Sequence, residues 1–168
     1  TLGIGREIFS PKAPELYDTP NHFIMGKTST DESSFQGTHG HHVSVIVDEA
    51  SGVDESYFNC IETMIHGGFG LYLFNPTDQS SHVFNLERTG LFHVVELNAL
   101  NHPNIKAEQQ GLTAPFPNAI RLEKLRELIK LWCEPTDEPK DNDFEFEGKF
   151  YHPSPVAEAR ILGRWSSQ

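Results

Sequence analysis

The sequence predicts an α/β fold with a mostly parallel sheet, and three consecutive segments carry this prediction. Residues 43–47 are mostly β-branched and apolar and are followed by two carboxylates, Asp48 and Glu49, which is typical of a buried strand that presents acids at the rim of a sheet. Apolar side chains at helical spacing follow in residues 54–66, and residues 71–74 form a second apolar run. Strand, helix and strand in this order make the crossover unit of a parallel sheet.

The chain before this unit is expected to be less regular. Residues 1–22 contain three prolines and little periodicity, so we expect a loosely ordered entry segment whose one helical candidate is residues 13–17. Residues 22–26 predict a short strand. Residues 28–34 are small, polar or acidic, which predicts an exposed loop.

Local signals bound the helix and the second strand. Asp54 is placed to cap the helix, and Gly67-Gly68 predicts its end. Pro76 stops the strand at residues 71–74, because proline has no N–H to donate to a ladder. The apolar stripe of the helix is expected to pack on the sheet.

The second half of the chain is predicted to hold fewer regular elements. We interpret residues 80–84 as a continued loop, residues 92–97 as an edge strand, and residues 98–117 as a long loop with a helical turn at residues 105–109. Leucine and isoleucine at helical spacing predict an amphipathic helix over residues 118–133. Its basic side chains are interpreted first as a solvated face and second as a subunit or DNA contact: Arg121, Lys124, Arg126 and Lys130.

The last part of the chain should form an acidic loop and a closing helix. Residues 134–147 hold seven acidic side chains, which is typical of a solvated loop. A helix is predicted from residue 154 or 155 to residue 162, because Pro155 suits a first helical turn and Gly163 a helix end.

The two carboxylates after the first strand suggest nucleotide chemistry. In an ATPase of the P-loop class, Asp48 would bind Mg²⁺ and Glu49 would polarise the attacking water. Asn75 and Thr77 follow the second strand, so all four side chains would meet at one edge of the sheet. The alternatives are that the acids cap the following helix and that residues 75–77 form a plain proline turn.

Three motifs in order resemble the large terminase subunits of tailed bacteriophages, in the second half of their ATPase domain. They are SFQGTHG at residues 34–40, VIVDEASGV at 45–53 and LFNPT at 73–77, with ALNHPNI and ARILGRW further on. The resemblance covers residues 24 to 165, and we assign residues 23–165 to this half-domain. It implies that Asp48 and Glu49 are the Walker B acids, as metal ligand and catalytic base. It also implies that Asn75 to Thr77 form the loop that couples hydrolysis to DNA movement.

The resemblance further implies a partial P-loop NTPase fold with ATP and Mg²⁺ as cofactors. The implied partners are double-stranded DNA, other terminase subunits and the portal, in a ring oligomer in the host cytoplasm. The family's phosphate-binding loop is not found, since Gly3-Ile4-Gly5-Arg6 lacks the required Lys-Ser/Thr ending. We therefore expect a fragment that hydrolyses ATP only in the intact subunit. Arg88 and Arg160 are candidate arginine fingers, although each is expected to pair with a local acid first.

Composition excludes several other classes. The formal net charge of −11 and pI near 5.2 argue against DNA binding by this fragment alone. No apolar run approaches the roughly 20 residues of a membrane span. No signal-peptide pattern of a basic start and an apolar stretch is seen, so we do not expect secretion. Cys60 and Cys133 lack zinc-ribbon spacing, so we expect two free thiols.

Three other functions stay open from the sequence. A metal-dependent hydrolase would use the cluster His39 to His42, although no HExxH spacing supports it. A helicase-type ATPase would need motifs after residue 77 that are not seen. A non-catalytic scaffold or interaction module would keep the fold without turnover.

Overall fold

The computed structural model describes residues 9–10, 13–19, 22–27 and 40–166. These residues form a mixed α/β structure, as predicted. The chain divides into two compact units. The first contains the described residues up to Val45 together with Glu55–Gly70, and the second contains Ile46–Asp54 and the chain from Leu71 onward. In the described part of the chain, no helix combines the length and apolar character that crossing a membrane requires.

An antiparallel sheet opens the first unit. Strands β1 (Phe9–Ser10), β2 (Ala13–Thr19) and β3 (His22–Met25) lie in this order, with Leu16 opposite Ile24. The strand predicted near residue 22 is confirmed. The helical candidate at residues 13–17 is wrong, because that segment is extended: residues 13 and 14 pair with β1, and residues 15–17 pair with β3. Cross-strand pairing, which local periodicity does not reveal, decides its conformation.

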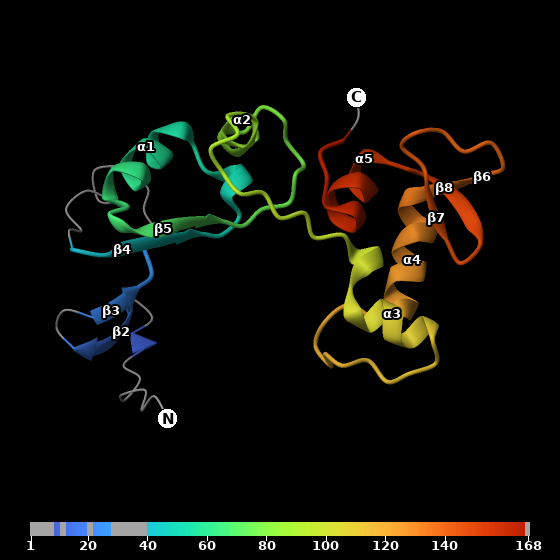
Figure 1. The fold of residues 1–168 in the computed structure, drawn as a ribbon, viewed down its shortest axis with the longest axis horizontal. Coiled ribbons are helices and arrows are strands. Elements are labelled where there is room, and N and C mark those ends of the chain that lie inside the picture. The colour runs from blue at the N-terminus through green and yellow to red at the C-terminus, as the bar shows by residue number, and fades with distance from the viewer. Residues whose placement is uncertain (1–8, 11–12, 20–21, 28–39, 167–168) are drawn as a thin grey trace. The chain divides into compact units, whose positions relative to one another are not determined.

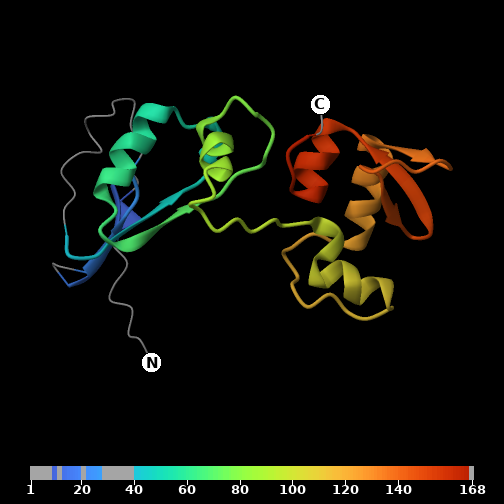
Figure 2. The ribbon, with the colours of Figure 1, turned by 45° about the horizontal axis from the view of Figure 1, so that its top comes forward.

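Strands β4 (Val43–Val47) and β5 (Gly67–Tyr72) form a separate two-stranded parallel sheet. Helix α1 (Glu55–Met64) connects them and lies alongside them in both views (Figure 1, Figure 2). Phe58 and Ile61 are its buried side chains. Among the described strands, parallel pairing is confined to this sheet, so the predicted predominance of parallel strands is wrong.

Strand β4 is less buried than the sequence predicted. Val47 is buried, but Ile46 is 63% exposed. On β5, Phe69 and Leu71 are also exposed. The alternation of exposed and less exposed residues along β4 is typical of a sheet covered on one face only.

The sequence predicted that Gly67 and Gly68 end the preceding helix. Instead, α1 ends at Met64, and the two glycines begin β5. A Cβ atom at Gly68 would lie 2.3 Å from the carbonyl oxygen of Val43. Only glycine permits this approach of the two backbones. The close packing of β4 and β5 therefore explains the glycine pair.

The second unit departs from the predicted loops. Residues 80–84 were expected to continue a loop, but helix α2 (His82–Arg88) starts there, buries Val83 and packs against the 3₁₀ turn η2 (Ala50–Gly52). The predicted strand at residues 92–97 is not formed. No strand among the described residues pairs with it, and Leu97 is 79% exposed.

The expected long loop at residues 98–117 contains two short helical elements. The 3₁₀ turn η3 (Ala99–Asn101) precedes helix α3 (Pro103–Gln109). His102 caps α3, since its Nδ1 accepts the N–H of Asn104 at 3.1 Å, and Pro103 occupies the first helical position. The helical turn predicted at residues 105–109 thus belongs to a longer helix.

Helix α4 (Leu122–Trp132) confirms the amphipathic helix and leads into a second antiparallel sheet. Strands β6 (Cys133–Thr136), β7 (Phe144–Phe146) and β8 (Lys149–Pro153) lie in the order β6-β8-β7. The acidic stretch at residues 134–147 is therefore not simply a solvated loop. Glu147 and Gly148 link β7 to β8 with φ of 50° and 77°, the backbone that a two-residue hairpin requires.

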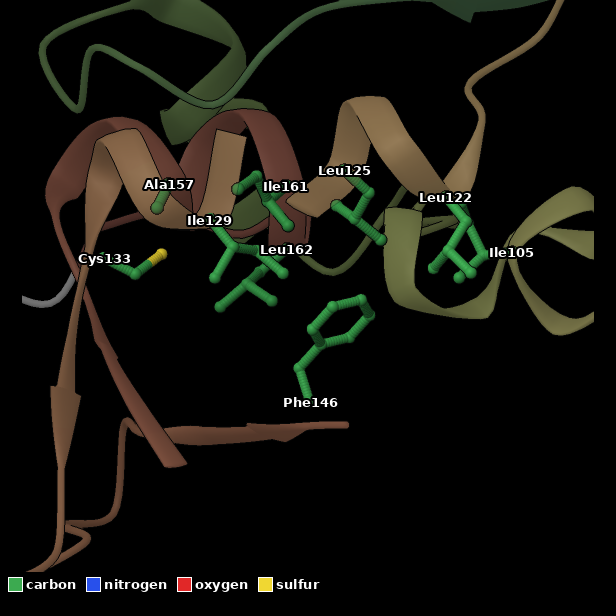
Figure 3. Packing of buried hydrophobic residues seen from close by; sticks show 9 residues of the cluster. All are labelled: Ile105, Leu122, Leu125, Ile129, Cys133, Phe146, Ala157, Ile161 and Leu162. Atoms are coloured by element: carbon green, nitrogen blue, oxygen red, sulfur yellow. The ribbon is translucent and has the colours of Figure 1, made fainter. Parts of the chain in front are cut away.

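The core of the second unit lies between α4, the β7–β8 hairpin and the closing helix. That helix, predicted from the sequence, consists of α5 (Pro155–Ala157) and the π-helical turn η4 (Glu158–Leu162). Figure 3 shows the ring of Phe146 pointing toward Leu125 and Leu162. The buried cluster comprises Ile105, Leu122, Leu125, Ile129, Cys133, Phe146, Ala157, Ile161 and Leu162.

Candidate functional site

The two acids of the predicted site form a tight turn at the end of β4. Asp48 accepts the N–H of Glu49 through Oδ1 at 3.0 Å, and Glu49 adopts a left-handed backbone with φ of 53°. The carbonyl of Glu49 accepts the N–H of Gly52 at 2.9 Å. A non-glycine residue in this region is uncommon and marks a specific local geometry. Both carboxylates are exposed, while Ala50 beneath them is fully buried.

Hydrogen bonds place this acid turn beside the end of β5. The N–H of Leu73 donates to Val47, and the N–H of Ala50 donates to Leu73, both at 2.9 Å. Val47 and Ala50, which flank Asp48 and Glu49, therefore bracket Leu73 just after strand β5. Asn75 follows two residues later, so the acid turn and the Asn75–Thr77 loop leave the strand pair at the same end.

The Asn75–Thr77 loop is partly fixed by its own backbone. Thr77 donates to the carbonyl of Asn75 from its N–H at 2.8 Å and from its hydroxyl at 3.4 Å. Pro76 is buried, while Asn75 and Thr77 are exposed. Both exposed side chains carry hydrogen-bonding groups suited to a polar ligand.

The carboxylates of Asp48 and Glu49 are oxygen donors, which suit a hard cation that also binds water or phosphate. Magnesium is usually held by one or two carboxylates, with water and substrate phosphates completing the shell. Asp48 and Glu49 match that chemistry. Among the described residues, no cluster of three or more histidine, cysteine, aspartate or glutamate side chains is arranged to hold a metal ion.

The histidine cluster is only partly within the described structure. His39 lies outside it, whereas His41 and His42 are exposed. The Nδ1–H of His42 donates to the carbonyl of Gly67 at 3.0 Å, assigning the proton to that nitrogen because a carbonyl only accepts. This bond gives His42 a structural role between β4 and β5.

An aromatic contact lies at the start of the Asn75–Thr77 loop. The sequence pattern did not predict it. Phe74 precedes Asn75, and its ring lies 5.5 Å from that of Trp165. The two residues are about 90 positions apart. An aromatic residue directly before Asn-Pro-Thr was the only local signal.

The predicted basic surface of α4 is largely neutralised. Arg121 pairs with Glu108, Lys124 with Glu127, and Arg126 with Glu147. Ion pairing leaves little unbalanced positive charge for a phosphate backbone. Of the two candidate arginine fingers, Arg88 has its guanidinium carbon 5.3 Å from the centre of the Phe84 ring, and Arg160 is exposed.

A polar hollow of about 220 Å³ lies apart from these residues, beside β6 and β8. It contains the Asp143–His152 pair, in which the Nδ1–H of His152 donates to the buried carboxylate at 2.7 Å. Asp143 also accepts the N–H of Lys140 at 2.9 Å. The Lys140 bond and then the His152 bond lower the pKa of Asp143. This pair fixes the loop between β6 and β7.

Comparisons of the chain with protein-family models, with characterised proteins and with solved structures find no match.

Proposed function

We propose that this chain supplies the Walker B acids and the coupling loop of an ATP-hydrolysing DNA-packaging motor, the large terminase subunit of a bacteriophage. The ordered motifs SFQGTHG, VIVDEASGV and LFNPT support the proposal. The observation that carries it is the bracketing of Leu73 by Val47 and Ala50. Those bonds put Asp48 and Glu49 at the same end of the strand pair as Asn75 and Thr77.

In this proposal each side chain has a distinct task. Asp48 binds Mg²⁺, which when present neutralises charge on the phosphate oxygens of ATP. Glu49 orients the attacking water and accepts its proton. Asn75 and Thr77 hydrogen-bond the terminal phosphate and pass its loss to the chain that follows. The fold would be part of a P-loop NTPase, with the phosphate-binding loop supplied by another part of the protein.

The proposed partners are double-stranded DNA, other terminase subunits and the portal, in a ring in the host cytoplasm. The net charge of −11 and the ion-paired arginines of α4 favour DNA contacts made by other parts of the motor. This assignment fits a domain whose main role is hydrolysis.

The test is ATP hydrolysis by the protein that contains this chain. Glu49→Gln keeps size and hydrogen bonding but removes the base, so turnover should fall by about 100-fold or more, while Mg²⁺-ATP binding persists. Glu62→Gln, the same change at an exposed position on α1, should leave turnover within about twofold.

Unaltered turnover in Glu49→Gln would remove the base assignment. No hydrolysis by the unaltered protein would favour the non-catalytic scaffold. Stoichiometric zinc in the purified protein would favour the hydrolase built on His39 to His42.

A further inference from the structure

The chain after η4 returns to the base of the Asn75–Thr77 loop. Once Gly163 has ended the helix, Trp165 packs its ring 5.5 Å from that of Phe74 and 4.9 Å from that of Phe84, edge-to-face with the latter. Edge-to-face and offset contacts are the favoured arrangements of aromatic pairs. Phe74 is thus in contact with the C-terminal segment at the point where the loop begins.

Polar bonds hold this segment on the side of α2. The indole N–H of Trp165 donates to Oε2 of Glu87 at 2.6 Å. Gln79 donates through Nε2 to the carbonyl of Ser166 at 2.6 Å. An N–H bond to a carboxylate is stronger than one between neutral groups. This bond fixes the orientation of the indole, in addition to its packing against Phe74 and Phe84.

Arg164 ties the same segment to the rest of the second unit. Its Nη2 donates to the carbonyl of Asn142 at 2.6 Å and pairs with Glu158 at 3.2 Å. Glu158 is only 3% exposed. Residues 164–166 therefore connect the chain around Phe74, Phe84 and Glu87 with the closing helix.

We infer that Trp165 is a positioning residue that holds the Asn75–Thr77 loop beside the acid turn for ATP hydrolysis. Asn75 follows Phe74 directly in the chain, so freeing the ring of Phe74 lets the loop drift away from the turn whose flanking residues bracket Leu73. A small displacement of groups that contact the reacting phosphate lowers the rate of hydrolysis more than the affinity for ATP. This inference rests on the proposed function.

The first measurement needs no nucleotide. In amide hydrogen exchange on the chain, Trp165→Ala should speed exchange at Leu73 and Thr77, whose N–H groups bond Val47 and Asn75, by about tenfold or more. Trp165→Phe keeps a ring but loses the bond to Glu87, so it should give a smaller effect. Trp132→Phe, which alters a partly buried tryptophan against the core, should leave exchange at both amides unchanged.

The second measurement is steady-state hydrolysis by the protein that contains the chain. Trp165→Ala should lower kcat about tenfold with KM for ATP within about twofold, and Trp165→Phe should recover most of the rate. A purely structural role would instead lower the amount of active protein in every variant, including Trp132→Phe, without this order.

Failure of the positioning role of Trp165 and failure of the proposed ATPase function give different results. Faster exchange with unchanged kcat overturns the positioning role, as does unchanged exchange in Trp165→Ala. If Trp165→Ala does not fold, exchange in Trp165→Phe decides, because this variant keeps the ring but loses the bond to Glu87. Exchange at Leu73 and Thr77 equal to that of the unaltered protein then overturns the role. Absence of hydrolysis in the unaltered protein overturns the proposed function and, with it, the catalytic consequence, whereas the exchange result reports on the contact alone.

Discussion

Asn104 holds the backbone of Phe116 from both sides. Its Oδ1 accepts the N–H of Phe116 at 2.9 Å, and its Nδ2 donates to the carbonyl of Phe116 at 2.7 Å and to that of Ile120 at 3.0 Å. The side chain is fully buried. One amide therefore satisfies the backbone of the loop between α3 and α4, which would otherwise leave polar groups unpaired.

Replacing Asn104 by alanine should cost about 2–4 kcal/mol of unfolding free energy, because three hydrogen bonds are lost and buried groups remain unpaired. Urea unfolding measures this. Asn101→Ala removes an exposed amide of η3 and should change the free energy by less than about 0.5 kcal/mol. Equal effects of the two substitutions would contradict the role of Asn104.

Gly163 should tolerate no side chain. It has φ of 70°, and a Cβ atom there would lie 2.5 Å from the carbonyl oxygen of Leu97. Gly163→Ala should therefore destabilise the protein by about 2 kcal/mol or more. Gly111 has a similar φ of 74° but open space around it, so Gly111→Ala should cost only about 1 kcal/mol. Comparing the two by thermal or urea unfolding separates the steric contact from the backbone preference.

Glu108 should make stability depend on acidification. The hydrogen bond from Arg121 and then that from the N–H of Leu122 hold the pKa of Glu108 below its ordinary value of 4.5. Because the folded pKa is the lower one, the stabilisation is complete above the ordinary value and is lost as the pH falls through the folded value.

The check is urea unfolding across the acid range. Glu108→Gln should be less stable than the unaltered protein at about pH 7, and the two should converge toward about pH 3. Glu145→Gln, at an exposed position of β7, should follow the unaltered protein at every pH. A constant difference for Glu108→Gln would show that its charge is not involved.

The thiols of Cys60 and Cys133 should differ in reactivity. Burial raises the pKa of the Cys133 thiol to about 11, so near pH 8 only about one molecule in a thousand carries the reactive thiolate. Cys60 is half-buried on α1. We expect one thiol to react with a disulfide reagent in the native protein and two after unfolding, and none to react quickly in Cys60→Ser. Rapid native labelling of Cys133 would contradict the packing in Figure 3.

Local pattern was enough where an element carries its own signals. The β-branched run before Asp48 predicted β4, helical spacing predicted α1 and α4, and Gly163 predicted the end of the closing helix. Glu147-Gly148 between alternating phenylalanines was a hairpin signal that the acidic composition concealed. The composition was correct about exposure but did not predict the strands.

The sequence by itself determined the α/β class, the acid pair at the end of a strand, and the polar loop after the next one. Only the tertiary structure decided that residues 13–17 are extended, that residues 92–97 stay unpaired, and that Trp165 contacts Phe74. The physical reason is that a strand needs a partner and an aromatic contact needs a neighbour. Both come from parts of the chain that the local pattern does not specify.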